Sequence, residues 1–540
     1  MRFNLDSVIH AMQAEQQQAE LWKISLTYDN LYNAYHCLAE NAEGASDPKT
    51  AYEHYFKADS VLNVIKGREG YWNEERAWSL SYLARSAAAL GDYDLSDSLY
   101  NSALKVYVEV KDNLDPEAAQ ILSDWSRSLS MRNEWPYANY LIRAAIGYTE
   151  ADTANKSRDT RWIRFRLQLV KNLIATDSLV LAERVLSPCE TAAHTDSSLR
   201  CETLLMKGAL QFRQEAFRSA DTTFEEAVAC LSSLQHNEAA KAIAYLSWGH
   251  VKTALADYGS ARKLVTQGQR ILAGTRSNPS IEVGLLQLSA EIHHLQGHYP
   301  SARKEYEASL DLASSSNSSN RMPSSIAGLA DVLLDLAEAS LASTLADSAL
   351  AMVVDSLPEI FPSQASVLNT AAYANYCLND LRKAQERYSI TLNACERHKA
   401  MRTTTYAQAL NGQALVAMAQ SHLATADSLL MQAYNTCIAI YGQEHPFTAR
   451  VLINQAELHI KKRRYFEARD LLLSALPTTE KFLGKDHDQL GDIHQALGEI
   501  DLRSANHAEA SRHFQEALRI YKACFPAYHP KVRALEKSGD

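Results

Sequence analysis

Residues 490–517 read LGDIHQALGEIDLRSANHAEASRHFQEA, and this stretch holds two apolar patterns of helical period joined by a short polar turn. The first pattern consists of large apolar residues at steps of 3, 4 and 3: Leu490, Ile493, Leu497 and Ile500. The second alternates small and large residues at steps of 4 and 3: Ala510, Phe514 and Ala517. Such spacings place side chains on one face of a helix. The stretch therefore predicts a helix, a tight turn and a second helix.

The small residue of the second pattern recurs along the chain at steps of 38 to 44 residues. Its occurrences are Ala58, Ser96, Ala138, Ala182, Ala220, Ala261, Ala302, Ala346, Ala384, Ala426, Ala468 and Ala510. A step between 20 and 50 residues that persists through a chain indicates a repeat array. We therefore expect an all-α solenoid of about twelve helical hairpins, and this architecture favours binding over catalysis.

The turn between the two helices of a unit is short and polar, as in Gly91-Asp92-Tyr93, Gly297-His298-Tyr299 and Asn379-Asp380-Leu381. Glycine and asparagine tolerate the left-handed conformation that ends many helices. A large residue often stands three positions before the recurring small one, and another stands four positions after it. We expect the small residue to let neighbouring helices approach closely.

The pattern resembles the tetratricopeptide repeat, most clearly in the unit with Leu497-Gly498, Ala510, Phe514 and Ala517. The step of roughly 41 residues exceeds the usual 34 and resembles the long repeats of kinesin light chain and of bacterial scaffold proteins. Tyr441 to Pro446 and Tyr528-His529-Pro530 match the Gly…His-Pro entry of that variety, whereas the copy at Gly484 to Asp488 lacks the proline. The resemblance implies a right-handed superhelix in a bacterial protein.

The organisation that we expect has five parts. They are an N-terminal capping helix (1–23), a first subarray of about seven units (24–313), a flexible Ser/Asn-rich loop (314–323), a second subarray of about five units (324–528) and a C-terminal cap or stub (529–540). The loop prediction rests on residues 314–320, a run of serine and asparagine.

The resemblance also implies that the first helix of each unit lines a concave groove. Carried onto this sequence, the positions that face the groove are Asn369, Tyr373, Tyr376, Asn411, Leu415, Met418, Ile453, Glu457 and Ile460. Asn454 sits one position along from Ile453, where similar arrays often carry a groove asparagine, and the predicted peptide site is Asn369, Tyr373, Tyr376, Asn411, Leu415, Met418, Asn454 and Glu457. A side-chain amide can donate to and accept from a peptide backbone. The alternative is that these residue types are merely frequent on polar helix faces.

No motif specific for catalysis or for a cofactor occurs in the sequence, so we expect neither. Of the weaker candidates, the histidines at 293, 294 and 298 are more consistent with a turn than with a metal site, and Cys524 and His529 do not predict a catalytic dyad. Two basic clusters, at 158–166 and 461–464, predict a patch for an anionic partner, either an acidic peptide or nucleic acid. The plainer interpretations are a solvated helix face and cations at a helix C-terminus.

Composition bounds the location and the partners. The formal charge is −10, which argues against nucleic acid as the main ligand. The eight scattered cysteines are typical of thiols in a reducing compartment, and no signal peptide or membrane span is evident, so we expect a cytoplasmic protein.

Two functions fit these features. The first is a scaffold or adaptor that binds protein or peptide partners in its groove. The alternative, implied by similar bacterial arrays, is a sensor subunit that regulates a separate caspase-like protease, kinase or transcription factor in signalling or defence.

Overall fold

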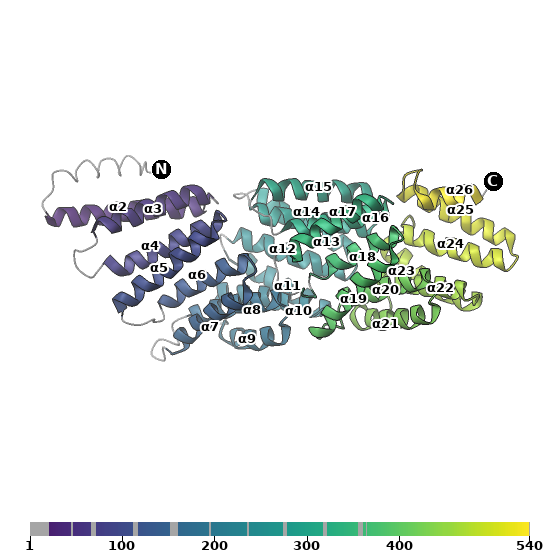
Figure 1. Ribbon diagram of the computed structural model, residues 1–540, viewed down its shortest axis with the longest axis horizontal. Helices are drawn as coiled ribbons and strands as arrows, with labels where there is room; N and C mark the ends of the chain where they lie inside the picture. The colour runs from purple at the N-terminus through teal and green to yellow at the C-terminus, as the bar shows by residue number, and fades with distance from the viewer. Residues whose placement is uncertain are drawn as a thin grey trace. The chain divides into compact units, whose positions relative to one another are not determined.

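The computed structural model describes residues 21–44, 47–65, 72–111, 117–151, 160–193, 196–234, 237–273, 278–316, 321–354, 360–362 and 364–538. The regular elements in these ranges are all helices (Figure 1). The predicted capping helix falls mainly on residues 1–20, outside the described ranges.

The chain divides into two compact units, residues 1–203 and residues 204–540, which we call unit 1 and unit 2. Unit 1 contains α2 (Leu21–Gly44), α3 (Pro48–Ile65), α4 (Trp72–Ala89), α5 (Tyr93–Lys111), α6 (Ala118–Met131), α7 (Trp135–Ala151), α8 (Arg161–Ala175) and α9 (Leu179–Ala192). Helix α10 (Ser197–Arg213) contributes residues to both units.

Unit 2 continues with shorter connections. It contains α11 (Phe217–Ser232), α12 (Glu238–Ala254), α13 (Tyr258–Ala273), α14 (Pro279–Leu295), α15 (Tyr299–Ser315), α16 (Met322–Asp335), α17 (Ala339–Val354), α18 (Ser366–Cys377), α19 (Leu381–Arg397), α20 (Thr404–Ala419), α21 (Leu423–Tyr441), α22 (Pro446–Lys461), α23 (Tyr465–Leu483), α24 (Asp488–Arg503), α25 (His507–Cys524) and α26 (Pro530–Ser538).

Helices α2 to α25 form twelve consecutive hairpins, which confirms the predicted all-α solenoid. Each of the twelve recurring small residues is at most 2% exposed, because it lies where the second helix of a hairpin meets its neighbours. The flanks of the predicted loop are helical: residues 314 and 315 end α15, and Met322 and Pro323 begin α16. The division at 314–323 stays a prediction.

From the α4–α5 hairpin to the α24–α25 hairpin, each turn adopts the left-handed conformation at one residue, as expected, but the residue is often neither glycine nor asparagine. Gly297 and Asn379 follow the prediction, whereas Glu215, Ala256 and Arg463 have positive φ without that advantage. At the end of α22, the Arg464 N–H donates to the His459 carbonyl and the Arg463 N–H donates to the Ile460 carbonyl. These paired bonds fix the left-handed residue whatever its side chain.

Ring-over-glycine contacts set the spacing between consecutive hairpins. A Cβ atom added to Gly412 would lie 2.2 Å from the Tyr388 ring, and one added to Gly328 would lie 2.3 Å from the Tyr306 ring. In each case the ring belongs to the second helix of one hairpin and the glycine to the first helix of the next. The absence of a side chain there lets the aromatic ring lie against the backbone.

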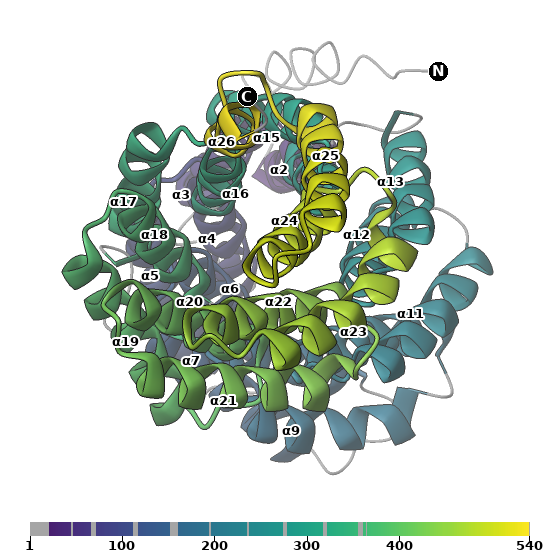
Figure 2. The same ribbon diagram turned by 90° about the vertical axis from the view of Figure 1, so that its right-hand side faces the viewer.

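The first helices of neighbouring hairpins in unit 2 pack more closely on one another than the second helices do. This difference makes the array curve, with α12, α14, α16, α18, α20, α22 and α24 on the concave side (Figure 2). Residues about 190 positions apart then meet again, because hydrogen bonds join pairs separated by 189 to 194 residues. With a step of roughly 41 residues, one superhelical turn takes between four and five hairpins.

Candidate protein-binding face

All of the predicted groove residues lie on three consecutive first helices of unit 2, α18, α20 and α22. The structure brings some of their side chains together and buries others, so each needs its own description.

Asn369, on α18, is 8% exposed. Its Nδ2 donates to the Thr405 carbonyl at 3.0 Å, which ties α18 to the start of α20. Its Oδ1 is buried and accepts no hydrogen bond from the described residues. Asn369 therefore has one amide atom engaged in packing and one acceptor left over.

Asn411 and Asn454 contact each other across α20 and α22. The Asn454 Nδ2 donates to the Asn411 Oδ1 at 2.7 Å. Asn454 is buried, and Asn411 is half-buried. The pair leaves the Asn411 amide N–H groups and the Asn454 carbonyl oxygen for other partners.

Tyr373 and Tyr376 stack on one another along α18, with ring centroids 6.0 Å apart. Both are half-buried, and burial raises the pKa of each phenol, so both stay neutral hydrogen-bonding groups. Glu457, on α22, is exposed. The surrounding protein nevertheless desolvates its carboxyl, and with the nearby Asp492 charge this raises the pKa of Glu457.

The two apolar members of the predicted site are turned toward the core. Met418 is 5% exposed inside the cluster formed by α20, α21 and α22, and Leu415 is half-buried against the same cluster. The surface that the predicted residues present is consequently more polar than the sequence indicated.

Sequence reasoning missed a network of charges on the next helices of the same face. The Arg450 guanidinium lies 3.0 Å from Asp492 and 3.9 Å from Asp488, and the Lys531 ammonium lies 2.5 Å from Asp492 and 3.7 Å from Asp488. Arg450 and Asp492 stand 42 residues apart, which is one repeat step, and this spacing was the only available signal. The network links α22, α24 and α26.

Asp488 occupies the position where the other two copies of the His-Pro entry have proline. Its carboxylate accepts a hydrogen bond of 2.8 Å from the Tyr299 hydroxyl, 189 residues earlier. Burial works to raise the pKa of Asp488, but opposing interactions, among them the charges of Lys531 and Arg450, outweigh it and hold that pKa below the usual range. The missing proline therefore reflects a buried carboxylate that connects one superhelical turn to the next.

The three histidines of the His-Pro entries make the same pair of contacts. In each, Nδ1 lies 3.1 to 3.2 Å from the backbone N–H two residues later and accepts its hydrogen bond, capping the first helix of a hairpin. Nε2 then carries the proton and donates to a carbonyl 191 to 194 residues earlier. The pairs are His445 with Ala254, His487 with Leu295, and His529 with Asp335.

Burial lowers the pKa of all three imidazoles, to about 4 for His445, so they are neutral at pH 7. The family resemblance pointed to these histidines as helix entries only. The structure adds their contact with the preceding superhelical turn.

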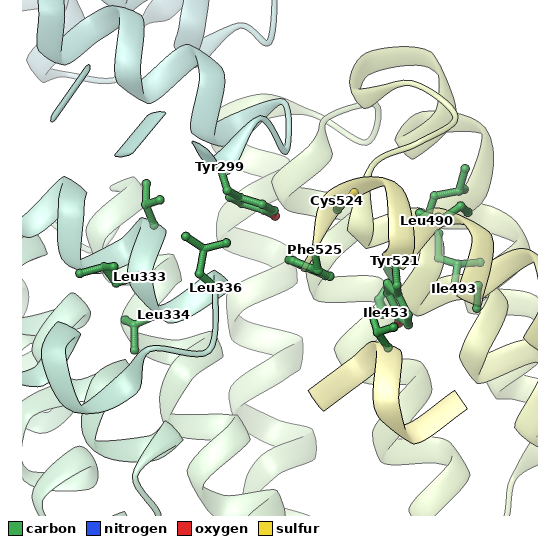
Figure 3. Packing of buried hydrophobic residues seen from close by; sticks show 14 of the residues in the cluster. Tyr299, Leu333, Leu334, Leu336, Ile453, Leu490, Ile493, Tyr521, Cys524 and Phe525 are labelled. Atoms are coloured by element: carbon green, nitrogen blue, oxygen red, sulfur yellow. The ribbon is translucent and has the colours of Figure 1, made fainter. Parts of the chain in front are cut away.

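Stacked aromatic rings accompany two of these contacts, those of His445 and His529. His445 stacks on Tyr441 at 4.0 Å, and Tyr441 stacks on Phe217 at 5.7 Å. His529 stacks on Phe525 in the same way, and Phe525 lies 5.4 Å from Tyr299. Figure 3 shows Tyr299 and Phe525 near each other, with Leu336 in the same cluster of buried side chains.

A further contact between superhelical turns joins Glu215 to the start of α20. The Glu215 carboxyl accepts from the Thr404 N–H at 2.6 Å and from the Thr404 hydroxyl at 3.0 Å. Burial raises the pKa of Glu215 to about 7.

The other candidates from the sequence are engaged in ordinary contacts. His294 pairs with Asp335 at 2.7 Å and His293 with Glu305 at 3.1 Å, on separate partners. The Cys524 thiol donates to the Asp486 carbonyl, and burial raises the pKa of that thiol to about 12, which disfavours a thiolate nucleophile.

Of the first basic cluster, Arg158 lies outside the described residues. Arg166 pairs with Glu150 at 2.5 Å and covers the Trp162 ring. Arg164 lies 3.8 Å from Glu202. These ion pairs are consistent with a solvated and largely neutralised helix face.

Six cysteines are free thiols, whereas Cys201 and Cys230 are disulfide-bonded, which corrects the expectation that all eight are thiols. Within the described ranges, no helix combines the length and the apolar character needed to cross a bilayer.

Comparison with known proteins agrees with this architecture. A family model described as tetratricopeptide repeat matches residues 451–523, which include α23 and α24. A "Clustered mitochondria protein homolog" from Candida albicans is 30% identical over 93 residues, a segment that covers 17% of this chain and only 7% of that protein.

Two solved structures share the fold at low sequence identity. The Cut9-Hcn1 hetero-tetramer of the APC/C has a TM-score of 0.53 at 13% identity and covers 99% of this chain and 95% of its own. A Rap protein complexed with Competence and Sporulation Factor has a TM-score of 0.51 at 13% identity, and the match covers 68% of this chain and 99% of that protein's chain. The chain is therefore a solenoid of tetratricopeptide-like helical hairpins. A kinesin-light-chain-like variety and a bacterial source stay predictions.

Proposed function

We propose that this protein is a non-enzymatic scaffold and that the concave face of unit 2 binds an extended segment of a partner protein. The observation that carries the proposal is the row of side chains on α18, α20 and α22. The Tyr373–Tyr376 stack, the Asn411–Asn454 pair and the exposed Glu457 stand on consecutive first helices.

The chemistry of this row suits a peptide. The Asn411 amide N–H groups and the Asn454 carbonyl oxygen have further hydrogen-bonding capacity, and the tyrosines offer a rigid apolar surface with a polar hydroxyl. The two fold neighbours are both complexes, one of Cut9 with Hcn1 and one of a Rap protein with Competence and Sporulation Factor. Both support protein or peptide partners for an array of this shape.

A site-specific photo-crosslinking experiment tests the proposal. A benzophenone amino acid replaces Tyr376 or Glu457 on the concave face, and Ile390 or Leu473 on the second helices serves as the matched control. After irradiation in the native cell, we expect both concave positions to crosslink to the same partner segment and the control positions to give none. Equal yields at the four positions would contradict a concave binding site.

A sensor that regulates a separate effector is the second candidate. The contacts between superhelical turns favour it, because a ligand on the concave face could change them and so change the pitch of unit 2. Small-angle X-ray scattering before and after addition of the crosslinked partner segment distinguishes the two functions. A passive scaffold leaves the scattering profile of the chain unchanged, whereas a sensor alters it.

A further inference from the structure

The hairpin turns of unit 2 fall into two sets that differ in what covers them. The first set consists of the loops inside four earlier hairpins, which are contacted by residues of the next superhelical turn. The loops are residues 213–217, 254–258, 295–299 and 335–339, and they are contacted by Thr404, His445, His487 and His529, respectively. The large residue that begins the second helix is consequently buried: Phe217 is 6% exposed, Tyr258 5% and Tyr299 2%.

The corresponding turns of the last hairpins form a surface that we call the open edge. It consists of residues 377–381, 419–423, 461–465 and 503–507. Within the described residues, no later superhelical turn reaches these four turns. The residues equivalent to Tyr299 are accordingly half-buried, as at Leu423 and Tyr465, or exposed, as at His507.

The open edge carries positive charge that the described part of the chain does not neutralise. Lys462 pairs with Asp427 at 2.7 Å, but Lys461, Arg463 and Arg464 are exposed and form no ion pair with the described residues. The dipole of α22 favours cations within its last turn only, and Arg463 and Arg464 lie beyond Lys461, the last residue of α22. Stabilisation of a helix end therefore does not account for the whole cluster.

An apolar side chain stands beside these cations. Phe466, two residues after Arg464, is 75% exposed, more than any other large apolar residue described. On the neighbouring turn, Leu502 is 47% exposed next to Arg503. Exposed aromatic and aliphatic groups next to unpaired cations are typical of interaction surfaces.

We propose that the open edge of unit 2 binds an acidic protein segment, with carboxylates on Lys461, Arg463 and Arg464 and an apolar residue against Phe466. Charge complementarity selects this partner, because the edge concentrates unpaired cations in a chain whose formal charge is −10. The surface is separate from the concave face, so it adds a second binding site to the proposed scaffold.

Fluorescence anisotropy on the full chain tests the proposal with a defined probe. The probe is a short labelled peptide of Glu and Asp with one central Phe, and single-stranded oligothymidine is the competing ligand. The test variants are K461S/R463S/R464S and F466S. The control is K263S/R270S/K304S, which removes three exposed cations from α13 and α15.

We expect the chain to bind the peptide, with an affinity about tenfold lower in the triple test variant, lower in F466S and unchanged in the control. Circular dichroism checks that each variant keeps its helices, and since all the altered residues are exposed we expect it to. The proposal would be overturned if the chain did not bind the peptide, or if the test and control variants lost affinity equally. It would also be overturned if oligothymidine bound more tightly than the peptide, or if sedimentation showed a dimer that the triple test variant abolishes. Photo-crosslinking at Glu457 reports on the concave face independently, so either proposal can fail alone.

Discussion

Units 1 and 2 are built from the same hairpin but are held together differently. In unit 1, tertiary contacts join neighbouring hairpins, such as Arg85 with Glu43 and Ser130 with Asn172, each 42 residues apart. In unit 2, similar contacts occur, and a second set joins residues 189 to 194 apart.

The equivalent residues at the start of the second helices show the effect. Tyr93 and Trp135 in unit 1 are half-buried, whereas Tyr258 and Tyr299 in unit 2 are buried. A solenoid with only neighbour contacts has a stability that is roughly a sum over hairpins. Contacts between superhelical turns make the stability of one hairpin depend on hairpins about 190 residues away. We infer that such contacts give a repeat array a cooperativity similar to that of a globular domain.

The largest expected effect comes from removing the buried carboxylate that joins two superhelical turns. D488A leaves Arg450 and Lys531 without this partner and the Tyr299 hydroxyl without its acceptor. We expect a loss of about 3–5 kcal/mol in the stability of unit 2, measured by urea denaturation. The matched change in unit 1, D97A, breaks the contacts with Arg132 and Trp125 between neighbouring hairpins and should cost about 1 kcal/mol. Equal losses would remove the distinction between the units.

The second prediction concerns pH. The pKa of Glu215 is about 7 in the folded chain and 4.5 as a free side chain, so folding favours the protonated form. Its contribution is therefore fully present below pH 4.5 and is lost as the pH rises through 7. E215Q keeps an acceptor for Thr404 without the charge, and at pH 8 it should be more stable than the natural chain by up to about 3 kcal/mol. Urea midpoints from pH 4.5 to 8 measure this, and a pH-independent difference would contradict it.

A smaller effect is expected from filling the space under an aromatic ring. In G412A the new methyl group meets the Tyr388 ring, so despite better helix propensity we expect a loss of about 1–3 kcal/mol. Gly147 in unit 1 has nothing within 4 Å of an added Cβ atom, and G147A should stabilise by about 0.5–1 kcal/mol. Thermal melts of both variants test whether close ring packing limits these positions. Melting temperatures that shift in the same direction and by similar amounts in G412A and G147A would show that ring packing does not limit these positions.

The smallest predicted effect isolates one histidine contact. In H445N the shorter side chain can still cap α22 but does not reach Ala254, so we expect a loss of about 1 kcal/mol at pH 7. The lowered pKa of His445 means that its contribution is full above pH 6.5 and falls as the pH approaches 4.

The E215Q background suits this measurement, because Glu215 then does not titrate in the same range. In that background, the loss of stability that H445N causes should shrink on acidification. A loss that stays constant from pH 7 to 4 would show that His445 acts only as a cap.

Local periodicity was enough to predict the hairpins. The recurring alanines, from Ala58 to Ala510, follow a helical spacing that tertiary context did not override, and all are buried. The turn residues were predicted less well, since Glu215 and Arg463 take the left-handed conformation that we expected only at glycine and asparagine. Backbone hydrogen bonds fix that conformation, and they leave no mark in side-chain identity.

The contacts between superhelical turns could not be predicted from one sequence. They depend on the curvature of the array, which is the sum of small rotations between successive hairpins. Because the sequence does not give these rotations, the number of residues between His445 or Asp488 and its partner could not be predicted. The aspartate in place of a proline at 488 was visible in the sequence but had no interpretation. The peptide site at Asn369, Asn411 and Asn454 stays a proposal, because the structure shows these amides partly engaged with each other and with the backbone.

Native-state hydrogen exchange of the full chain, followed by mass spectrometry at increasing urea, measures the central difference most directly. If contacts between superhelical turns unite unit 2, the amides of α12 to α16 and of α22 to α26 become exchangeable together in one cooperative opening. The helices of unit 1 then open separately and at lower free energy. Independent opening of α14 and α24, or a single opening shared by units 1 and 2, would contradict the account.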